Sequence, residues 1–275
     1  MKSVILSVPG AVLGFILLVT CLAPLLPLLD PIAMNVGQRF AQPSVGHLLG
    51  QDEYGRDLLA RIVFAMRSAL FISGSSAVIA GLVGSTLGVI AGYTRGMTEA
   101  LSMRSMDVIL CFPPLLLAML AVTFYGPGAL TLIPVLAVVF VPSFARVAHA
   151  SVLVVRAQEY VEATRSMGAS RSWIMFRTIL PNIVGSLIVQ FSFVVVMSVV
   201  LESGLSFLGL GVVPPTPSLG LMIGSGRATL SHEPLLLIWP CLALSILILV
   251  LNAFCDRLRD HFDPRHGTTQ GAKLQ

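Results

Sequence analysis

Apolar stretches of about 20 residues alternate with short polar or Pro/Gly-rich segments along the whole chain. Six of them lie near residues 4–28, 68–93, 104–125, 129–150, 183–210 and 235–255. A helix of about 20 residues is long enough to cross the roughly 30 Å apolar core of a bilayer. The pattern therefore predicts an all-α, polytopic membrane protein with six transmembrane helices.

The boundaries between these stretches divide the chain into four parts. Residues 1–29 hold a first transmembrane helix, 30–67 an external loop ending in an amphipathic helix, 68–265 a five-helix core, and 266–275 a polar tail. The first stretch also resembles a signal peptide, with Cys21 near a lipoprotein cleavage box. Thr20 is too large for that box, so we expect an uncleaved helix.

Composition and charge agree with a membrane protein and suggest its orientation. Only 11% of the residues are charged, against about a quarter in soluble domains. If both termini are cytosolic, 12 of the 17 basic residues lie inside. The positive-inside rule therefore predicts an N-in, C-in topology. No basic run contains interleaved aromatic residues, so we expect no nucleic-acid partner.

The residue types that carry catalysis are poorly represented in the sequence. Lysine occurs only at Lys2 and Lys273, so the chain has no Gly-Lys-Ser/Thr loop for nucleotide phosphates. The four cysteines and five histidines show no spacing typical of a disulfide framework or a metal site. We expect a chain that is not an enzyme and that holds no cofactor or metal of its own.

Small residues recur every four positions in the second apolar stretch. They are Ser76, Ala80, Gly84, Gly88 and Gly92, and they share one helix face on which a second backbone can approach closely. The sequence leaves open whether that backbone belongs to this chain or to another subunit.

The most polar internal segment, residues 151–182, links the fourth and fifth stretches. Residues 159–167 favour a helix, Gly168 is a natural stop and Ser170 a natural N-cap. A second short helix then covers 171–179 before Pro181 opens the fifth span. Two interpretations remain: a helix-turn-helix that meets a cytosolic partner, or an interfacial helix held by anionic lipid through its arginines.

The same segment resembles a known motif. Glu162-Ala163-Thr164, then Gly168, then Thr178-Ile179-Leu180-Pro181 is similar to the Glu-Ala-Ala, Gly and Ile-x-Leu-Pro pattern of bacterial ABC importer permeases. Thr164 replaces the second Ala, and Thr178 replaces Ile. Of the two interpretations, this resemblance favours the one in which the segment meets a cytosolic partner.

Three further segments resemble the dipeptide, oligopeptide and nickel branch of these permeases. They are His47–Asp57, with Gln51 in place of Thr; Leu205–Ser218, followed by Leu219 where Trp is common; and Asp256–Pro264. The chain is thus identified as a member of that branch, as its second (C-type) permease. The resemblance implies the type I ABC importer permease architecture in a bacterial inner membrane.

The resemblance also implies a set of partners. These are a second homologous permease, two ATP-binding cassette ATPases that bind ATP and Mg²⁺, and a periplasmic or lipoprotein solute-binding protein, in addition to membrane lipid. The residues that would dock on the ATPase are Glu162, Ala163, Thr164, Gly168, Ala169, Trp173 and Phe176.

Candidate pathway and receptor residues come from other segments. Pro113 and Pro114 can break the third span, and Phe207 follows a charge at membrane depth, Glu202. Such a charge is costly unless it faces water or a partner, so Glu202 indicates a pathway or subunit contact rather than a snorkelling surface position.

The external loop offers Asp52, Arg56 and Asp57 to a binding protein. Its alternative role is a solvated helix that leads into the second span. The Gly- and Pro-rich segment 205–217 can form a re-entrant turn where protein or water satisfies its backbone.

Three classes of function remain at this stage: an ATP-driven importer subunit, an ion-coupled carrier working alone, and a scaffold without transport. The first is preferred, because a lone carrier usually shows internal repeats and charged sites at mid-membrane. Peptide is the expected solute on the breadth of the family. Nickel or a metallophore, and glutathione, are the alternatives.

Overall fold

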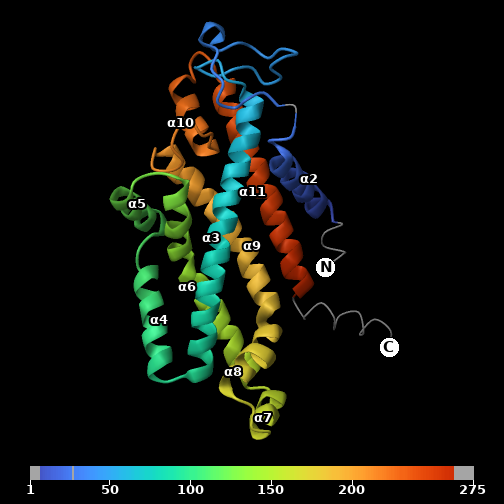
Figure 1. Ribbon diagram of the computed structural model, residues 1–275, viewed down its shortest axis with the longest axis vertical. Helices are drawn as coiled ribbons and strands as arrows, with labels where there is room; N and C mark the ends of the chain where they lie inside the picture. Colours follow the sequence, from blue (N-terminus) through green and yellow to red (C-terminus); the bar gives the residue numbers. More distant parts are fainter. Residues whose placement is uncertain (1–6, 27, 263–275) are drawn as a thin grey trace.

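The computed structural model describes residues 7–26 and 28–262, and these form a bundle of helices with no β-strand among them. Figure 1 shows the long helices running roughly side by side. We call the end that carries residues 30–57 the upper end and the end that carries α7 the lower end. The elements are α2 (Val8–Leu22), η1 (Val36–Gln38), α3 (Leu58–Thr94), α4 (Met97–Leu110), α5 (Pro114–Tyr125), α6 (Ala129–Arg156), α7 (Glu159–Ser166), α8 (Arg171–Trp173), η2 (Ile174–Ile179), α9 (Leu180–Phe207), α10 (Leu219–Ala228) and α11 (Leu235–Phe262).

Four of the described helical stretches are long and apolar enough to cross a membrane. They are α3, α6, the continuous stretch Arg171–Phe207 and α11, and α4 with α5 gives a fifth if the bent pair is one span. The predicted membrane character is confirmed. The helix expected in the first apolar stretch is α2, whose 15 residues reach only about 22 Å.

The third predicted span is broken. α4 and α5 meet at an angle of 86°, and Pro113 and Pro114 lie at the junction as the N-cap and first residue of α5. Proline has no N–H to donate and its ring crowds the preceding turn, so a helix cannot continue straight through the pair. The predicted break is confirmed, and the helical part before it begins earlier than predicted, at Met97.

The second span begins earlier than its apolar pattern suggests. α3 runs without interruption through 37 residues, so the amphipathic segment near 55–66 is its first part and not a separate, solvated helix. Leu58, Ala60 and Ile62 are buried there. Asp57 caps the helix, because its Oδ2 accepts a hydrogen bond of 2.8 Å from the Ala60 N–H.

The small-residue face of α3 packs against α6 of the same chain. A Cβ atom at Gly84 would approach the Val141 carbonyl oxygen to 2.5 Å, and one at Gly88 would collide with the Ala145 carbonyl oxygen. The two backbones are thus in direct contact, as small residues allow. Of the two interpretations left open above, packing within the chain is the one observed.

Three apolar clusters hold the bundle together. The largest joins α3, α5, α6 and α9 around residues such as Leu132 and Phe144. A second, around Leu219 and Leu247, joins α10 and α11 to the first turns of α3 and to α9. The third lies at the lower end, where α3 and α6 meet the 157–179 loop. Each end of the bundle thus has a packed base on which polar segments rest.

Candidate functional site

The polar loop at the lower end folds as its helix-stop and N-cap residues predict. α7 stops before Gly168, which takes a positive φ of 83°, a conformation that glycine adopts without strain. Ser170 then caps the next helix, and its Oγ accepts from the Trp173 N–H at 3.3 Å. The predicted helix, stop and N-cap are all confirmed.

The second helix of this loop differs from expectation, because it does not end before Pro181. Residues 171–207 form one continuous helical stretch, with six residues, Ile174–Ile179, in a π-helix. Pro181 cannot donate to the carbonyl of residue 177 and its ring crowds that carbonyl. The wider turn before Pro181 accommodates this mismatch, as π segments do elsewhere in long helices.

Buried side chains fix the loop to the bundle. Val161, Ile174 and Ile179 are each at most 1% exposed and pack in a cluster with Val89, Val152 and Tyr93 from α3 and α6. Arg156 adds a polar tie, because its Nη1 donates to the Tyr93 carbonyl at 2.9 Å. The loop is therefore a small, rigid extension of the bundle.

The outward side of this loop carries most of the predicted docking residues. Trp173 is 50% exposed and Phe176 61%. Glu162, Ala163 and Gly168 are also exposed, whereas Thr164 and Ala169 are half-buried. Tyr160 and Met167 are exposed in the same loop and were not selected from the sequence, although their apolar character in a polar segment was a usable signal. We call Tyr160, Met167, Trp173 and Phe176 the lower apolar group.

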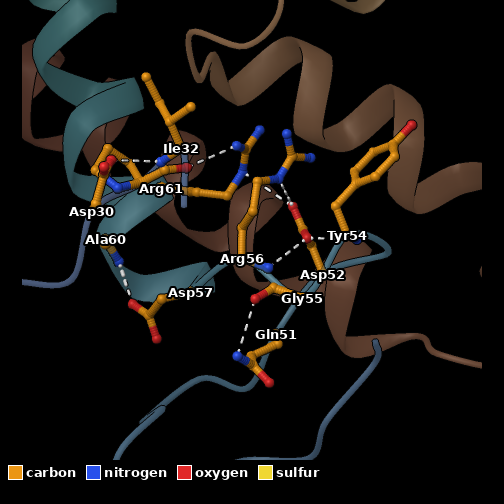
Figure 2. A network of polar contacts seen from close by, with 11 residues as sticks. Asp30, Ile32, Gln51, Asp52, Tyr54, Gly55, Arg56, Asp57, Ala60 and Arg61 are labelled. Atoms are coloured by element: carbon orange, nitrogen blue, oxygen red, sulfur yellow. Dashed lines mark hydrogen bonds and ion pairs between the residues drawn. The ribbon is translucent and has the colours of Figure 1, made fainter. Parts of the chain in front are cut away.

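At the upper end, Asp52 is the centre of a buried ionic network, which Figure 2 shows. Its Oδ1 accepts from the backbone N–H groups of Tyr54 and Arg56 at 2.9 and 3.0 Å. Its Oδ2 accepts from Arg56 Nε at 2.7 Å and lies 3.3 Å from Arg61 Nε. Arg61 Nη1 also donates to the Pro31 carbonyl at 3.1 Å. The network ties the 30–57 loop to the start of α3.

The three residues predicted to meet a binding protein have internal roles in this structure. Asp52, Arg56 and Asp57 are each 6% exposed, and Asp57 both caps α3 and contacts His47 Nδ1 at 3.0 Å. Their contact with a binding protein stays a prediction, and a direct contact would require this network to open. The large apolar side chains that the loop exposes most are Val45 and Leu48.

A cavity of about 400 Å³ opens beside this network. Its walls come from the 30–57 loop and the first turns of α3 on one side, and from Pro214, α10 and α11 on the other. Glu53 lies in its wall, and burial, reinforced by the neighbouring Asp52 carboxylate, raises the pKa of Glu53 above its ordinary value. Arg56 and Arg61 oppose that shift in the Glu53 pKa.

Glu202 is enclosed by three serine side chains. Its carboxylate accepts from Ser206 Oγ at 2.7 Å, Ser218 Oγ at 3.1 Å and Ser203 Oγ at 3.3 Å, and its side chain has no exposed surface. Ser206 Oγ also accepts from the Val212 N–H at 3.2 Å. In this structure the carboxylate joins the end of α9 to the start of α10, and a pathway role for Glu202 stays a prediction.

The remaining pathway candidates, Pro113, Pro114 and Phe207, lie around the end of α9. Pro113 and Pro114 are exposed at the α4–α5 bend, and the adjacent Leu115 reaches within 3.9 Å of the Cβ position of Gly204. Phe207 is 38% exposed at the last residue of α9. The structure thus brings the bend next to the part of α9 that lies between Glu202 and Phe207. The sequence did not indicate the three serines, although Ser206 lies one turn from Glu202 on the same helix face.

A family model described as binding-protein-dependent transport system inner membrane component matches residues 84–267. The chain belongs to this family. It is similar to the glutathione transport system permease protein GsiD of Pectobacterium atrosepticum, with 39% identity over 81% of this chain and 74% of that protein. It is also similar to the di/tripeptide transport system permease protein DppC of Pseudomonas aeruginosa, with 38% identity over 79% of this chain and 72% of that protein.

Solved structures agree with the fold of this family. The inward-facing MetNI methionine ABC transporter contains a chain that superposes with a TM-score of 0.63 at 18% identity, covering 75% of this chain and 98% of that one. An amino acid ABC transporter gives a TM-score of 0.55 at 15% identity, covering 74% and 94%. This family member is therefore a membrane-embedded permease subunit of an ABC importer, and the family description gives its location as the inner membrane.

Proposed function

We propose that this chain is the C-type permease of an importer for peptides of the di- and oligopeptide class. It pairs with a second homologous permease and forms half of the translocation path. Two ATPase subunits bind ATP and Mg²⁺ and attach at the lower end, and a solute-binding protein delivers the solute to the upper end. The chain itself holds no cofactor and catalyses no reaction.

The observation that carries this proposal is the lower apolar group. Aromatic side chains that are half exposed, on a loop whose other side is packed into the bundle, are typical of the anchors in a protein interface. They are accompanied by Glu162 and Gly168, whose motif positions led to the same segment. A rigid loop of this kind can transmit a push from a partner to α6 and α9.

The proposed topology has six spans, with both termini on the cytosolic side. Its support is the distribution of arginines: Arg156, Arg165, Arg171 and Arg177 all belong to the lower end, which would be cytosolic under the positive-inside rule. Two arginines of the upper end, Arg56 and Arg61, are paired with Asp52.

The partner assignment is tested by coexpressing the chain with the permease, ATPase and binding-protein genes of its own operon. We expect the ATPases to copurify with the permeases, and we expect the loaded binding protein to increase ATP hydrolysis. If the purified chain alone moves solute into vesicles without nucleotide, the proposed function is wrong.

The solute is tested by competition for uptake. Unlabelled dipeptides and tripeptides should compete with a labelled dipeptide, and glutathione is the second candidate because GsiD, a glutathione permease by name, is 39% identical. Preferential competition by glutathione would replace the first choice with the second. Competition by neither would contradict the peptide assignment.

A further inference from the structure

The cavity at the upper end combines charged and apolar walls. Asp52, Glu53, Arg56 and Arg61 line one side, and the opposite side consists of Pro214, Pro215, Leu221, Met222, Ser225 and Leu236. Its volume of about 400 Å³ lies within the range of small-molecule sites, which are mostly apolar with a few well-placed polar groups. The cavity thus has the size and composition of a binding site.

Its two arginines are only partly satisfied by the protein. Asp52 Oδ2 pairs with the Nε atoms of both Arg56 and Arg61, and Arg61 Nη1 donates to the Pro31 carbonyl. Figure 2 shows the two guanidinium groups close together, with terminal nitrogens directed away from Asp52. Among residues 7–26 and 28–262, nothing accepts a hydrogen bond from either terminal nitrogen of Arg56 or from Arg61 Nη2. These donors remain available on the cavity side.

The free guanidinium donors of the site favour an anionic acceptor. Two guanidinium groups share the one carboxylate of Asp52, and Glu53, the other acid in the wall, forms no ion pair with any described residue. Guanidinium groups bind carboxylates through paired, charge-assisted hydrogen bonds. A carboxylate that entered the cavity would satisfy the free donors of Arg56 and Arg61.

We propose that this cavity binds a carboxylate group of a small organic solute, such as the C-terminal carboxylate of a short peptide. The apolar wall of Leu221, Met222 and Leu236 then contacts the apolar part of that solute. The inference rests on the proposed function only in taking the ligand to be an imported solute. It places a weak solute site on the upper surface, lined by Arg56 and Arg61.

A free solute fits this site better than a side chain of another protein. Arg56 is 6% exposed and Arg61 3%, so a group that reaches both has to enter the cavity. Its walls come from four segments of the chain, which leaves little room for a protein surface to follow a carboxylate inside. A protein side chain is therefore an outcome to be excluded by the test.

The test is an equilibrium binding measurement on the purified transporter, without binding protein and without nucleotide. The probes are labelled dialanine and dialanine amide, which differ in the terminal carboxylate alone. We expect the acid to bind at least about tenfold more tightly than the amide, since the amide loses the charge-assisted pair. Equal binding of the two probes, or binding of neither, would overturn the proposal.

Variants locate the site and separate binding from folding. Arg56→Gln and Arg61→Gln should each weaken dialanine binding about tenfold, whereas Arg67→Gln, which removes an exposed arginine from the same helix, should leave it unchanged. Glu53→Gln removes a competing negative charge and should tighten binding several-fold. Because damage to the fold cannot tighten binding, an unchanged or lower affinity in Glu53→Gln would contradict the site.

The measurement is independent of the proposed function. Membranes that contain the chain alone can be used for the same comparison of acid and amide. If the ATPases fail to copurify while dialanine still binds through Arg56 and Arg61, the importer assignment fails and the site remains. If the ATPases copurify and respond to solute but acid and amide bind alike, the site fails and the importer assignment remains.

Discussion

The two ends of the bundle differ in the burial of their candidate functional side chains. At the upper end, Asp52, Arg56 and Glu202 are buried and bonded to other groups of the same chain. At the lower end, Trp173 and Phe176 are half exposed or more and lie on a loop fixed from behind by Val161 and Ile174. The upper end is completed internally, whereas the lower end offers its side chains to a partner.

This difference separates two kinds of mutational effect. A substitution in the internal network should lower the free energy of unfolding, because buried polar partners lose their hydrogen bonds. A substitution on the outward side of the lower loop should leave stability intact and affect coupling. The comparison fails if a substitution in the upper network affects only coupling, or if a substitution on the outward side of the lower loop affects stability.

The largest effect is expected where the two ends are joined, at the contact between α3 and α6. Gly88→Leu puts a side chain where the Ala145 backbone lies, and overpacking of this kind costs about 3 kcal/mol or more. We expect loss of folded protein in detergent, measured by size-exclusion chromatography. Gly74→Leu is the matched control, because nothing lies within 4 Å of its Cβ position, and equal losses in both variants would contradict the contact.

The next effect tests the lower end. Trp173→Ala should reduce uptake to background, since truncating an aromatic anchor costs an interface about 2 kcal/mol or more, while the thermal unfolding midpoint stays the same. Gly168→Asp should act similarly through the turn. Phe15→Ala removes an aromatic side chain of α2 that is more exposed than Trp173, and this variant should transport normally. Normal transport by Trp173→Ala would show that this end is not a docking surface.

Asp52→Asn tests the upper end. It leaves two buried guanidinium groups without their shared counter-charge, which should lower the free energy of unfolding by about 3 kcal/mol. Chemical denaturation in detergent measures this change. Asp30→Asn alters an exposed carboxylate of the same loop, which accepts from the Ile32 N–H, and should change stability by less than about 0.5 kcal/mol. Similar values for both would mean that the network contributes little.

Glu202→Ala should have a somewhat smaller effect at the same end. It leaves the hydroxyl groups of Ser203, Ser206 and Ser218 without their acceptor, at a cost of about 2 kcal/mol. Glu233→Ala serves as control, because among the described residues that carboxylate accepts only an exposed hydrogen bond from Gln42. Loss of uptake without loss of stability in Glu202→Ala would instead favour the pathway role predicted for this residue.

The smallest effect concerns pH. Burial raises the Glu53 pKa above its ordinary value of 4.5, so the folded state binds more protons than the unfolded state between 4.5 and the raised pKa. Stability should therefore decrease as the pH rises through that window. Glu53→Gln should flatten this slope and change stability by less than about 0.5 kcal/mol, because the partly exposed group is screened by solvent. An unchanged slope in unfolding curves would contradict the assignment.

The sequence predicted the features that depend on local chemistry. Gly168 and Ser170 act as stop and cap, and Pro113 breaks the third span, because each effect involves only a few neighbouring residues. The buried environment of Asp52 could not be predicted from neighbouring residues. Its partner Arg61 lies nine residues further along the chain, inside α3, and is buried only once the 30–57 loop folds over that helix.

The same reasoning explains the misjudged start of α3 and the unexpected surroundings of Glu202. Arg61 and Arg67 interrupt the apolar pattern, so the first turns of α3 read as an amphipathic surface helix, although Arg61 is buried. Ser218 lies 16 residues from Glu202, and the two meet only because the chain turns back between α9 and α10. Both cases depend on tertiary contacts that periodicity does not record.

The backbone contact between α3 and α6 limits how the molecule can move. α3 starts in the Asp52 network and ends beside the cluster that holds the lower loop, a length of about 55 Å for its 37 residues. Where Gly84 and Gly88 touch α6, sliding one helix along the other would drive main-chain atoms into each other. We therefore expect α3 and α6 to move together as a rigid pair when the lower loop is displaced. Such a movement would tilt the walls of the cavity at the upper end.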